Sequence, residues 1–201
     1  MRYRRWNLRG VSPFPPGVWW LLIANSALFI LELVFPRGLI RLFGLNPSAF
    51  WTHHQVWTPV TYMFLHGGFL HLFFNMLVLL MFGSRLEEFW GTQFFLKYYF
   101  ITGIGAGLSN VLFTPNAPWT IIGASGAMFG LLAAYGLLFP NNIIFFYFII
   151  PIKAKYLVIL FGIFEFFASL RPGADPVAHL AHLGGMIIGV MYLLHYKIVR
   201  R

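Results

Sequence analysis

The feature that most constrains this chain is a series of long apolar runs, each bounded by Pro, Gly or charged residues. Most of them approach the ~20 residues that an α-helix needs to cross a bilayer. Of the 201 residues, 59% are hydrophobic and 9% are charged, whereas a soluble domain carries about 25% charged residues. The pattern predicts six transmembrane helices, over 18–35, 68–86, 93–113, 125–139, 156–170 and 178–199.

We expect an all-α membrane protein that forms a single domain over 1–201. In this interpretation 1–17 is a basic arm, 18–199 holds the six spans and 200–201 is a short tail. The apolar segment 143–152 is too short to cross the bilayer by itself. We expect it to lie at the interface or to extend a neighbouring helix.

The basic residues are distributed unequally between the two sides that six spans would define. Eleven lie on the side of the termini and three on the other, a bias that places both termini in the cytoplasm. The net charge of +9 is therefore a topology signal within a lipid bilayer, and we expect no nucleic-acid partner. We expect a multi-pass protein of the plasma (inner) membrane. The eleven are Arg2, Arg4, Arg5, Arg9, Arg85, Lys97, Lys153, Lys155, Lys197, Arg200 and Arg201, and the three are Arg37, Arg41 and Arg171.

The composition excludes several kinds of chemistry. The chain has no cysteine, so it has no disulfide and no thiolate nucleophile or ligand. It has no HExxH zinc-protease motif, and Asp175 is its only aspartate, whereas an aspartyl protease needs two. The pairs His53-His54 and His179/His182 have no adjacent carboxylate or Cys to complete a zinc set. We therefore expect no metal and no cofactor.

Polar residues inside predicted spans are costly and usually functional or paired. The second, fourth and sixth spans carry His71 with Asn75, Ser125, and His182, each in the first part of its span and on the outer side. The 15 residues from Ser125 to Phe139 extend only ~22 Å as a helix, less than the ~30 Å hydrocarbon core. The fourth span therefore begins below the outer surface. His182 lies seven residues beyond Asp175-Pro176, a predicted helix start, and so reaches a similar depth, ~10 Å down its helix.

These residue types fit nucleophilic catalysis. A serine hydroxyl becomes nucleophilic when a histidine accepts its proton, which makes Ser125 the candidate nucleophile and His182 the candidate base. The Ser125 backbone N–H, His71 and Asn75 can donate to an oxyanion. The glutamates lie in other spans or at their ends, so a Ser–His dyad without a third acid is the simplest hypothesis. Glu165, in the fifth span, has no assigned role.

Simpler interpretations stay open at this point. A serine in a membrane helix often bonds back to its own helix, and His71 with Asn75 can form a structural hydrogen bond between helices. Glycine pairs at Gly126/Gly130 and Gly185/Gly189 are typical of close helix packing. Polar residues inside spans are also found in small transporters and channels, although no internal repeat is visible.

Four motifs, in this order, resemble those of the rhomboid family of intramembrane serine proteases. They are the H-x4-H-x3-N pattern of His66, His71 and Asn75, then Gly83-x3-Glu87, then Gly123-Ala124-Ser125-Gly126, then Ala181-His182-Leu183-Gly184-Gly185-x3-Gly189. The resemblance implies a rhomboid-like bundle of six helices with a short fourth span and an active site that opens to the outer face. It also implies transmembrane protein substrates, which are cleaved in or near their membrane segments.

The resemblance also implies the roles of individual residues. Ser125 would attack, His182 would act as the base, and His71, Asn75 and the Ser125 N–H would form the oxyanion hole. Gly126 and Gly185 would let their helices touch, and Phe129 would stack on His182 where relatives often carry Tyr. Trp57 is followed by Thr58, where many relatives have Arg. A catalytically silent member of the family is the alternative, although such members typically lack the Ser or the His.

Overall fold

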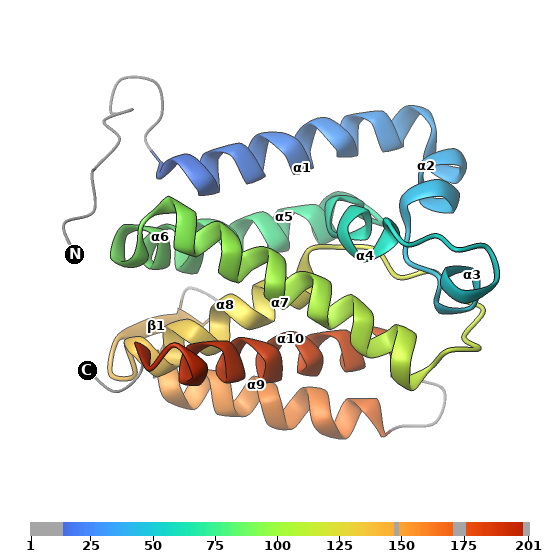
Figure 1. Cartoon of the computed structure of the whole chain (residues 1–201). Helices are drawn as coiled ribbons and strands as arrows, with labels where there is room; N and C mark the ends of the chain where they lie inside the picture. The colour runs from blue at the N-terminus through green and yellow to red at the C-terminus, as the bar shows by residue number, and fades with distance from the viewer. Residues whose placement is uncertain (1–13, 147–148, 171–175, 199–201) are drawn as a thin grey trace.

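The structure is a computed structural model that describes residues 14–146, 149–170 and 176–198, and it is 75% helical. Long helices lie alongside one another and successive ones run in alternate directions (Figure 1). Each predicted apolar run coincides with a helix. These helices are α1 (Pro16–Val34), α5 (Phe69–Val78) continued through the π-helical turn η2 (Leu79–Gly83) into α6 (Ser84–Trp90), α7 (Thr92–Phe113), α8 (Ser125–Leu138), α9 (Ala154–Ser169) and α10 (Pro176–His195).

The start of α1 and the end of α10 lie at the same end of the bundle, where β1 lies beside the end of α10, while α2, α3 and α4 lie at the opposite end (Figure 1). Among the described residues, two helical segments are both long and apolar enough to cross a bilayer, Pro16–Val34 and Phe69–Trp90. Ser125–Leu138 and His179–His195 are apolar but shorter. The helices over the six runs are therefore confirmed, while six membrane crossings stay a prediction.

Glu87 of α6 connects that helix to α1. Its carboxylate accepts hydrogen bonds from the backbone N–H groups of Gly17 and Val18, each at 2.8 Å, and from the Thr92 hydroxyl at 2.7 Å. These N–H groups belong to the first turn of α1, which has no intrahelical acceptors for them. Glu87 thus caps α1 from another helix. A Cβ added at Gly83 would lie 3.0–3.4 Å from Leu79, Phe95 and Val18, so a glycine lets these helices approach closely.

Helix α8 lies in the core between α7 and α10, and nine of its fourteen residues are buried. A Cβ added at Gly185 would overlap the Gly126 carbonyl oxygen, so this pair brings the backbones of α8 and α10 together. The other two glycines face α7, as Gly126 also does at Ala106. A side chain at Gly130 would meet Thr102, and one at Gly189 would meet Tyr98. The four glycines therefore pack three helices, rather than two, around the start of α8.

The prediction of an all-α chain is wrong for 143–152. This segment forms an antiparallel hairpin of β1 (Ile143–Phe146) and β2 (Ile150–Lys153), in which Ile144 pairs with Ile152. It therefore does not extend a helix. Proline is tolerated on a strand edge that has no second neighbour, and Pro151 lies in a strand with a single partner. Ile144 is buried against the core, so a β-branched apolar run is stable here as a strand.

The long connection after α1 contains short helices, α2 (Pro36–Phe43), α3 (Pro47–Thr52), α4 (Thr58–Thr61) and the 3₁₀ turn η1 (Tyr62–Phe64). Leu45 is fully buried and exchanges two backbone hydrogen bonds, of 3.0 and 2.8 Å, with Ile121. This connection therefore holds the segment that leads to Ser125. The Thr58 side chain is buried and donates to the Gln55 carbonyl at 2.7 Å. The predicted helix cap at Asp175 lies outside the described residues.

Candidate active site

Ser125 is the first residue of α8, and the backbone before it is fixed on both sides. Ile121 bonds to Leu45, and the Gly123 N–H donates to the Tyr62 carbonyl at 2.9 Å. Gly123 has φ +117, a conformation that favours glycine, and a Cβ there would lie 2.7 Å from the His71 ring. Gly123 thus lets the chain pass His71 and start a helix at Ser125, whose N–H has no acceptor within that helix.

His182 of α10 reaches Ser125 across the glycine contact. Its Nε2 lies 2.8 Å from the Ser125 Oγ. Phe129, one turn after Ser125 on α8, stacks on the His182 ring with centroids 4.2 Å apart and an interplanar angle of 12°. The predicted stacking of Phe129 is therefore confirmed. Ser125, His182 and Phe129 thus come from two helices whose backbones touch at Gly126 and Gly185.

His71 and Asn75 occupy one face of α5, next to the segment before Ser125. The Gly67 N–H donates to His71 Nδ1 at 3.3 Å, so a neutral His71 carries its proton on Nε2. The Nε2 edge of the ring lies against Gly123. Asn75 Nδ2 donates one hydrogen to the His71 carbonyl at 2.8 Å and retains a second. His71 and Asn75 therefore each have one N–H donor that the hydrogen bonds described here do not use.

The His66 ring packs against the His71 ring. The two rings pack edge to face with centroids 5.1 Å apart, and His66 is 2% exposed. The His66 backbone N–H donates to the Glu32 carboxylate at 2.9 Å, which fixes the turn before α5 to α1. His66 thus lies in a position to orient His71, without contacting Ser125 or His182 itself.

Glu165 is the residue that the sequence reasoning did not connect to the site. It lies on α9, and its Oε1 is 3.1 Å from His182 Nδ1, while its Oε2 is 2.5 Å from His179 Nδ1. The expectation that no acid lies next to His182 is therefore wrong. The packing of α9 against α10 brings the carboxylate there, and spacing within the sequence does not predict that packing. The available signal was an ionisable residue inside an apolar span.

The same three residues bear on the question of metal binding. Glu165, His179 and His182 each offer a donor atom, and these atoms lie within 4.8 Å of one another. His179 and His182 therefore do have a carboxylate beside them, and the prediction that they lack one is wrong. However, each carboxylate oxygen already faces a ring nitrogen, and the other nitrogen of His182 faces Ser125. We interpret the group as a chain of polar contacts that ends on the serine.

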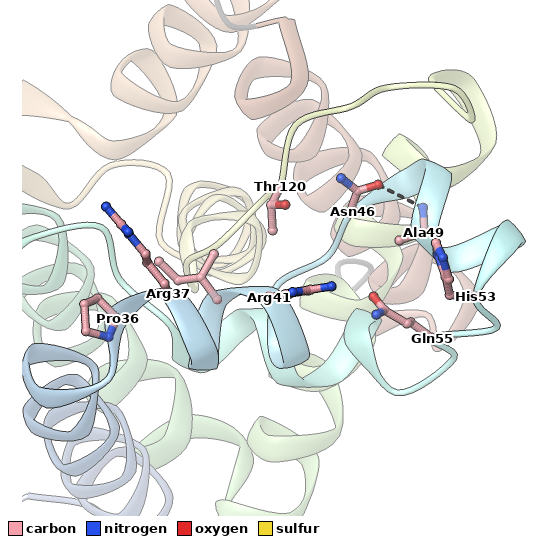
Figure 2. Close-up of a pocket in the computed structure, with 9 residues that line it drawn as sticks. Pro36, Arg37, Arg41, Asn46, Ala49, His53, Gln55 and Thr120 are labelled. Atoms are coloured by element: carbon pink, nitrogen blue, oxygen red, sulfur yellow. Dashed lines mark hydrogen bonds between the residues drawn. The ribbon is translucent and has the colours of Figure 1, made fainter.

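A pocket of about 470 Å³ lies in the connection between α1 and α4 (Figure 2). Arg37 and Arg41 of α2 border it, and the Asn46 side chain that caps α3 stands on the opposite side. Its lining includes neither Ser125 nor any residue in contact with it. The full lining is Pro36, Arg37, Ile40, Arg41, Asn46, Ala49, His53, Gln55 and Thr120.

Comparison with known proteins agrees with this geometry. Residues 53–197 match the Rhomboid domain, and this range contains Ser125, His182 and the residues in contact with them. The chain belongs to the rhomboid family. Rhomboids are membrane-embedded, and membership supports a protease-type function within the bilayer, although some members are named inactive.

Three relatives show how far the likeness extends. Rhomboid-like protease 3 of Toxoplasma gondii is 28% identical over 94% of this chain and 72% of its own length. Inactive RHOMBOID-like protein 8 of Arabidopsis thaliana is 32% identical over 72% of this chain and 39% of its own. Rhomboid protein 1, mitochondrial, of Saccharomyces cerevisiae is 36% identical over 78% and 53%, respectively. Except for the first, the chain spans about half or less of the length of these relatives.

Proposed function

We propose that this rhomboid is an intramembrane serine endopeptidase that cleaves membrane-anchored proteins in or near their transmembrane segments. The observation that carries the proposal is the 2.8 Å approach of His182 Nε2 to Ser125 Oγ. A hydroxyl with a histidine at this distance is the arrangement that nucleophilic catalysis by serine requires. A family member named inactive is the reason to test the chemistry directly.

In the first step, Ser125 Oγ attacks the carbonyl carbon of the scissile peptide bond while its proton moves to His182 Nε2. The stacking of Phe129 on the His182 ring restricts the rotation of that ring while the proton moves. The product of attack is a tetrahedral intermediate with negative charge on the former carbonyl oxygen.

We infer that three donors stabilise that charge. The Ser125 N–H lies at the N-terminus of α8, where the helix dipole adds partial positive charge. His71 carries its proton on Nε2, next to Gly123, and Asn75 has one amide hydrogen that is not used by the His71 carbonyl. Donors that are fixed before the reaction need no reorganisation when the charge develops.

Collapse of the intermediate breaks the C–N bond, and His182 returns the proton to the leaving amine. The acyl group remains on Ser125 as an ester. Water then attacks the ester, with His182 again accepting and returning a proton, and releases the second fragment as a carboxylic acid. This sequence consumes one water for each peptide bond and requires no metal or cofactor.

We also infer a single membrane domain with six crossings, both termini in the cytoplasm and an active site open to the outer face of a plasma membrane. The distribution of basic residues supports this orientation. Because the chain has no cysteine, single substitutions test it cleanly. An impermeant thiol reagent should label Thr52→Cys in intact cells and label Lys197→Cys only after permeabilisation. Labelling with the opposite pattern would overturn the orientation.

Labelling by a fluorophosphonate probe tests the catalytic roles. In detergent, the wild-type protein should be labelled, while Ser125→Ala and His182→Ala should lose labelling by about a thousandfold or more. Ser109→Ala is the matched control, because the Ser109 hydroxyl bonds back to the Gly105 carbonyl of its own helix. That variant should be labelled like the wild type.

The contrary result would be a wild-type protein that stays unlabelled beside a working rhomboid. It would remove the protease proposal and favour a catalytically silent rhomboid that binds membrane proteins. Solute flux that is independent of Ser125 would instead favour a transport function.

A further inference from the structure

The base of a serine protease must hold its protons in one arrangement. If His182 Nε2 is to accept the Ser125 proton, the neutral ring must carry its own proton on Nδ1. In this structure His182 Nδ1 is buried and has no aligned hydrogen-bond partner in the described part of the chain. Without a partner, Nδ1 favours neither tautomer of the His182 ring, so the nearest polar group decides which nitrogen carries the proton.

That nearest group is the Glu165 carboxylate, with Oε1 at 3.1 Å from Nδ1. The two atoms are close enough for a hydrogen bond, although their present geometry does not form one. Glu165 is 4% exposed, on a helix whose other residues are mostly apolar. A carboxylate in such a place is costly and is retained where it has a specific partner.

The other glutamates in the structure are committed elsewhere. Glu32 accepts the His66 N–H, Glu87 caps α1, and Glu88 pairs with Arg85 at 3.4 Å on the surface. Within the described part of the chain, Glu165 is therefore the one glutamate that faces the ring of the proposed base.

We propose that Glu165 is the positioning residue of a Ser125–His182–Glu165 triad. The inference rests on the proposed function. The carboxylate accepts the Nδ1–H of His182, which leaves Nε2 free to take the serine proton, and its charge stabilises the imidazolium that results. No proton passes to Glu165 in this step. The acid comes from α9 and the base from α10, so the complete triad exists only while the two helices are packed together.

A purely structural role is the competing explanation. Glu165 Oε2 also contacts His179 Nδ1 at 2.5 Å, and this contact by itself would fasten α9 to α10. The two roles separate experimentally, because His179→Ala removes the fastening contact and leaves the Glu165–His182 pair. If Glu165 only fastens the helices, loss of either partner has the same consequence.

The test compares wild type, Glu165→Gln, Glu165→Asp and His179→Ala, purified in detergent. We would measure the rate of fluorophosphonate labelling, kcat and KM on a transmembrane peptide, and the thermal unfolding midpoint. Glu165→Gln should lower the labelling rate and kcat about a hundredfold, less than the ~10⁴ of a fully aligned serine-protease acid, with KM within about twofold. Glu165→Asp should recover part of this loss. His179→Ala should change kcat by less than about threefold.

Two results would overturn the triad while leaving the dyad intact. In the first, Glu165→Gln is labelled at the wild-type rate. In the second, Glu165→Gln and His179→Ala are equally impaired and lose stability in parallel. If Glu165→Gln does not fold, Glu165→Asp is the deciding variant. Its shorter side chain holds the carboxylate farther from His182, so kcat should fall at constant KM. A wild-type rate would reject the proposal. Failure of the proposed function looks different, since wild type would then be labelled no more than Ser125→Ala.

Discussion

Helices α8 and α9 are neighbours of similar length, but they are packed in opposite ways. Nine of the fourteen residues of α8 are buried, against four of the sixteen of α9. The glycines of α8 pack against the backbone of α10 and against side chains of α7, whereas α9 directs large apolar side chains outwards, including Ile163, Phe164 and Phe167, each more than half exposed. The serine therefore begins a helix that has almost no freedom to shift.

The difference also divides the proposed catalytic group. Ser125, Phe129 and His182 lie on the tightly packed pair α8 and α10, while Glu165 lies on the loosely packed α9. At its first residues α9 is held by the bond from the Ala154 N–H to the Asn142 carbonyl and by Val158 against Gly136. Near its last turn the polar contacts of Glu165 perform this role. In the proposed catalytic group, Ser125 is therefore held rigidly, while the position of Glu165 depends on one peripheral helix.

The strongest test of the comparison is Gly185→Val. A side chain at this position overlaps the Gly126 carbonyl, which is backbone and cannot rotate away. We expect a loss of about 3 kcal/mol or more in unfolding free energy, together with loss of probe labelling. Unfolding monitored by circular dichroism in detergent would measure the first effect. A stable, active variant would show that α8 and α10 are less tightly joined than described.

Hydrogen exchange of the unmodified protein should distinguish the tightly packed α8 from the loosely packed α9. Amides in a tightly buried helix exchange mainly through large-scale opening, while those in a peripheral helix exchange through local opening. We expect the amides of Leu131 and Leu132 in α8 to exchange more than about tenfold slower than those of Ile163 and Phe164 in α9. Mass spectrometry on peptic fragments would measure this, and equal rates would remove the contrast.

Substitution of an aromatic residue should affect catalysis when the residue lies on α8, and not when it lies on α9. Phe129→Ala removes the ring stacked on His182, which should lower the probe-labelling rate about tenfold because the base loses its fixed orientation. Phe167→Ala is the matched control, because this α9 side chain is 61% exposed and contacts neighbouring Phe166. Its labelling rate should stay within about twofold of wild type. Equal effects would indicate that stacking does not position His182.

The smallest expected effect is that of Gly162→Ala on α9. A Cβ there would lie 3.4 Å from the flexible end of Met186, which has room to move. Alanine is favoured over glycine inside a helix, so we expect a stabilisation of about 0.5 kcal/mol. The unfolding midpoint in detergent would rise slightly. A clear destabilisation would show that α9 is packed more tightly against α10 than its exposure indicates.

Much of the site was predictable because its chemistry is carried by unusual residues in apolar surroundings. His71, Asn75, Ser125 and His182 are conspicuous inside long hydrophobic runs, and alternating spans give them a common depth. The contact between Ser125 and His182 and the stacking of Phe129 agree with that prediction. The roles of Gly126 and Gly185 followed from small-residue spacing, but Gly130 and Gly189 turned out to face α7, because spacing does not identify the partner helix.

The sequence by itself determined where the helices run, since hydrophobic length and breaking residues act locally along the chain. It also determined which residues are able to react, since that depends on residue type. Only the tertiary structure decided that 143–152 is a hairpin and that Glu165 reaches His182 and His179. Both depend on which surfaces meet, and the packing of α9 against α10 is set by many weak contacts between distant residues. An acid on a neighbouring helix becomes a partner only when that packing brings it within 3.1 Å of the histidine.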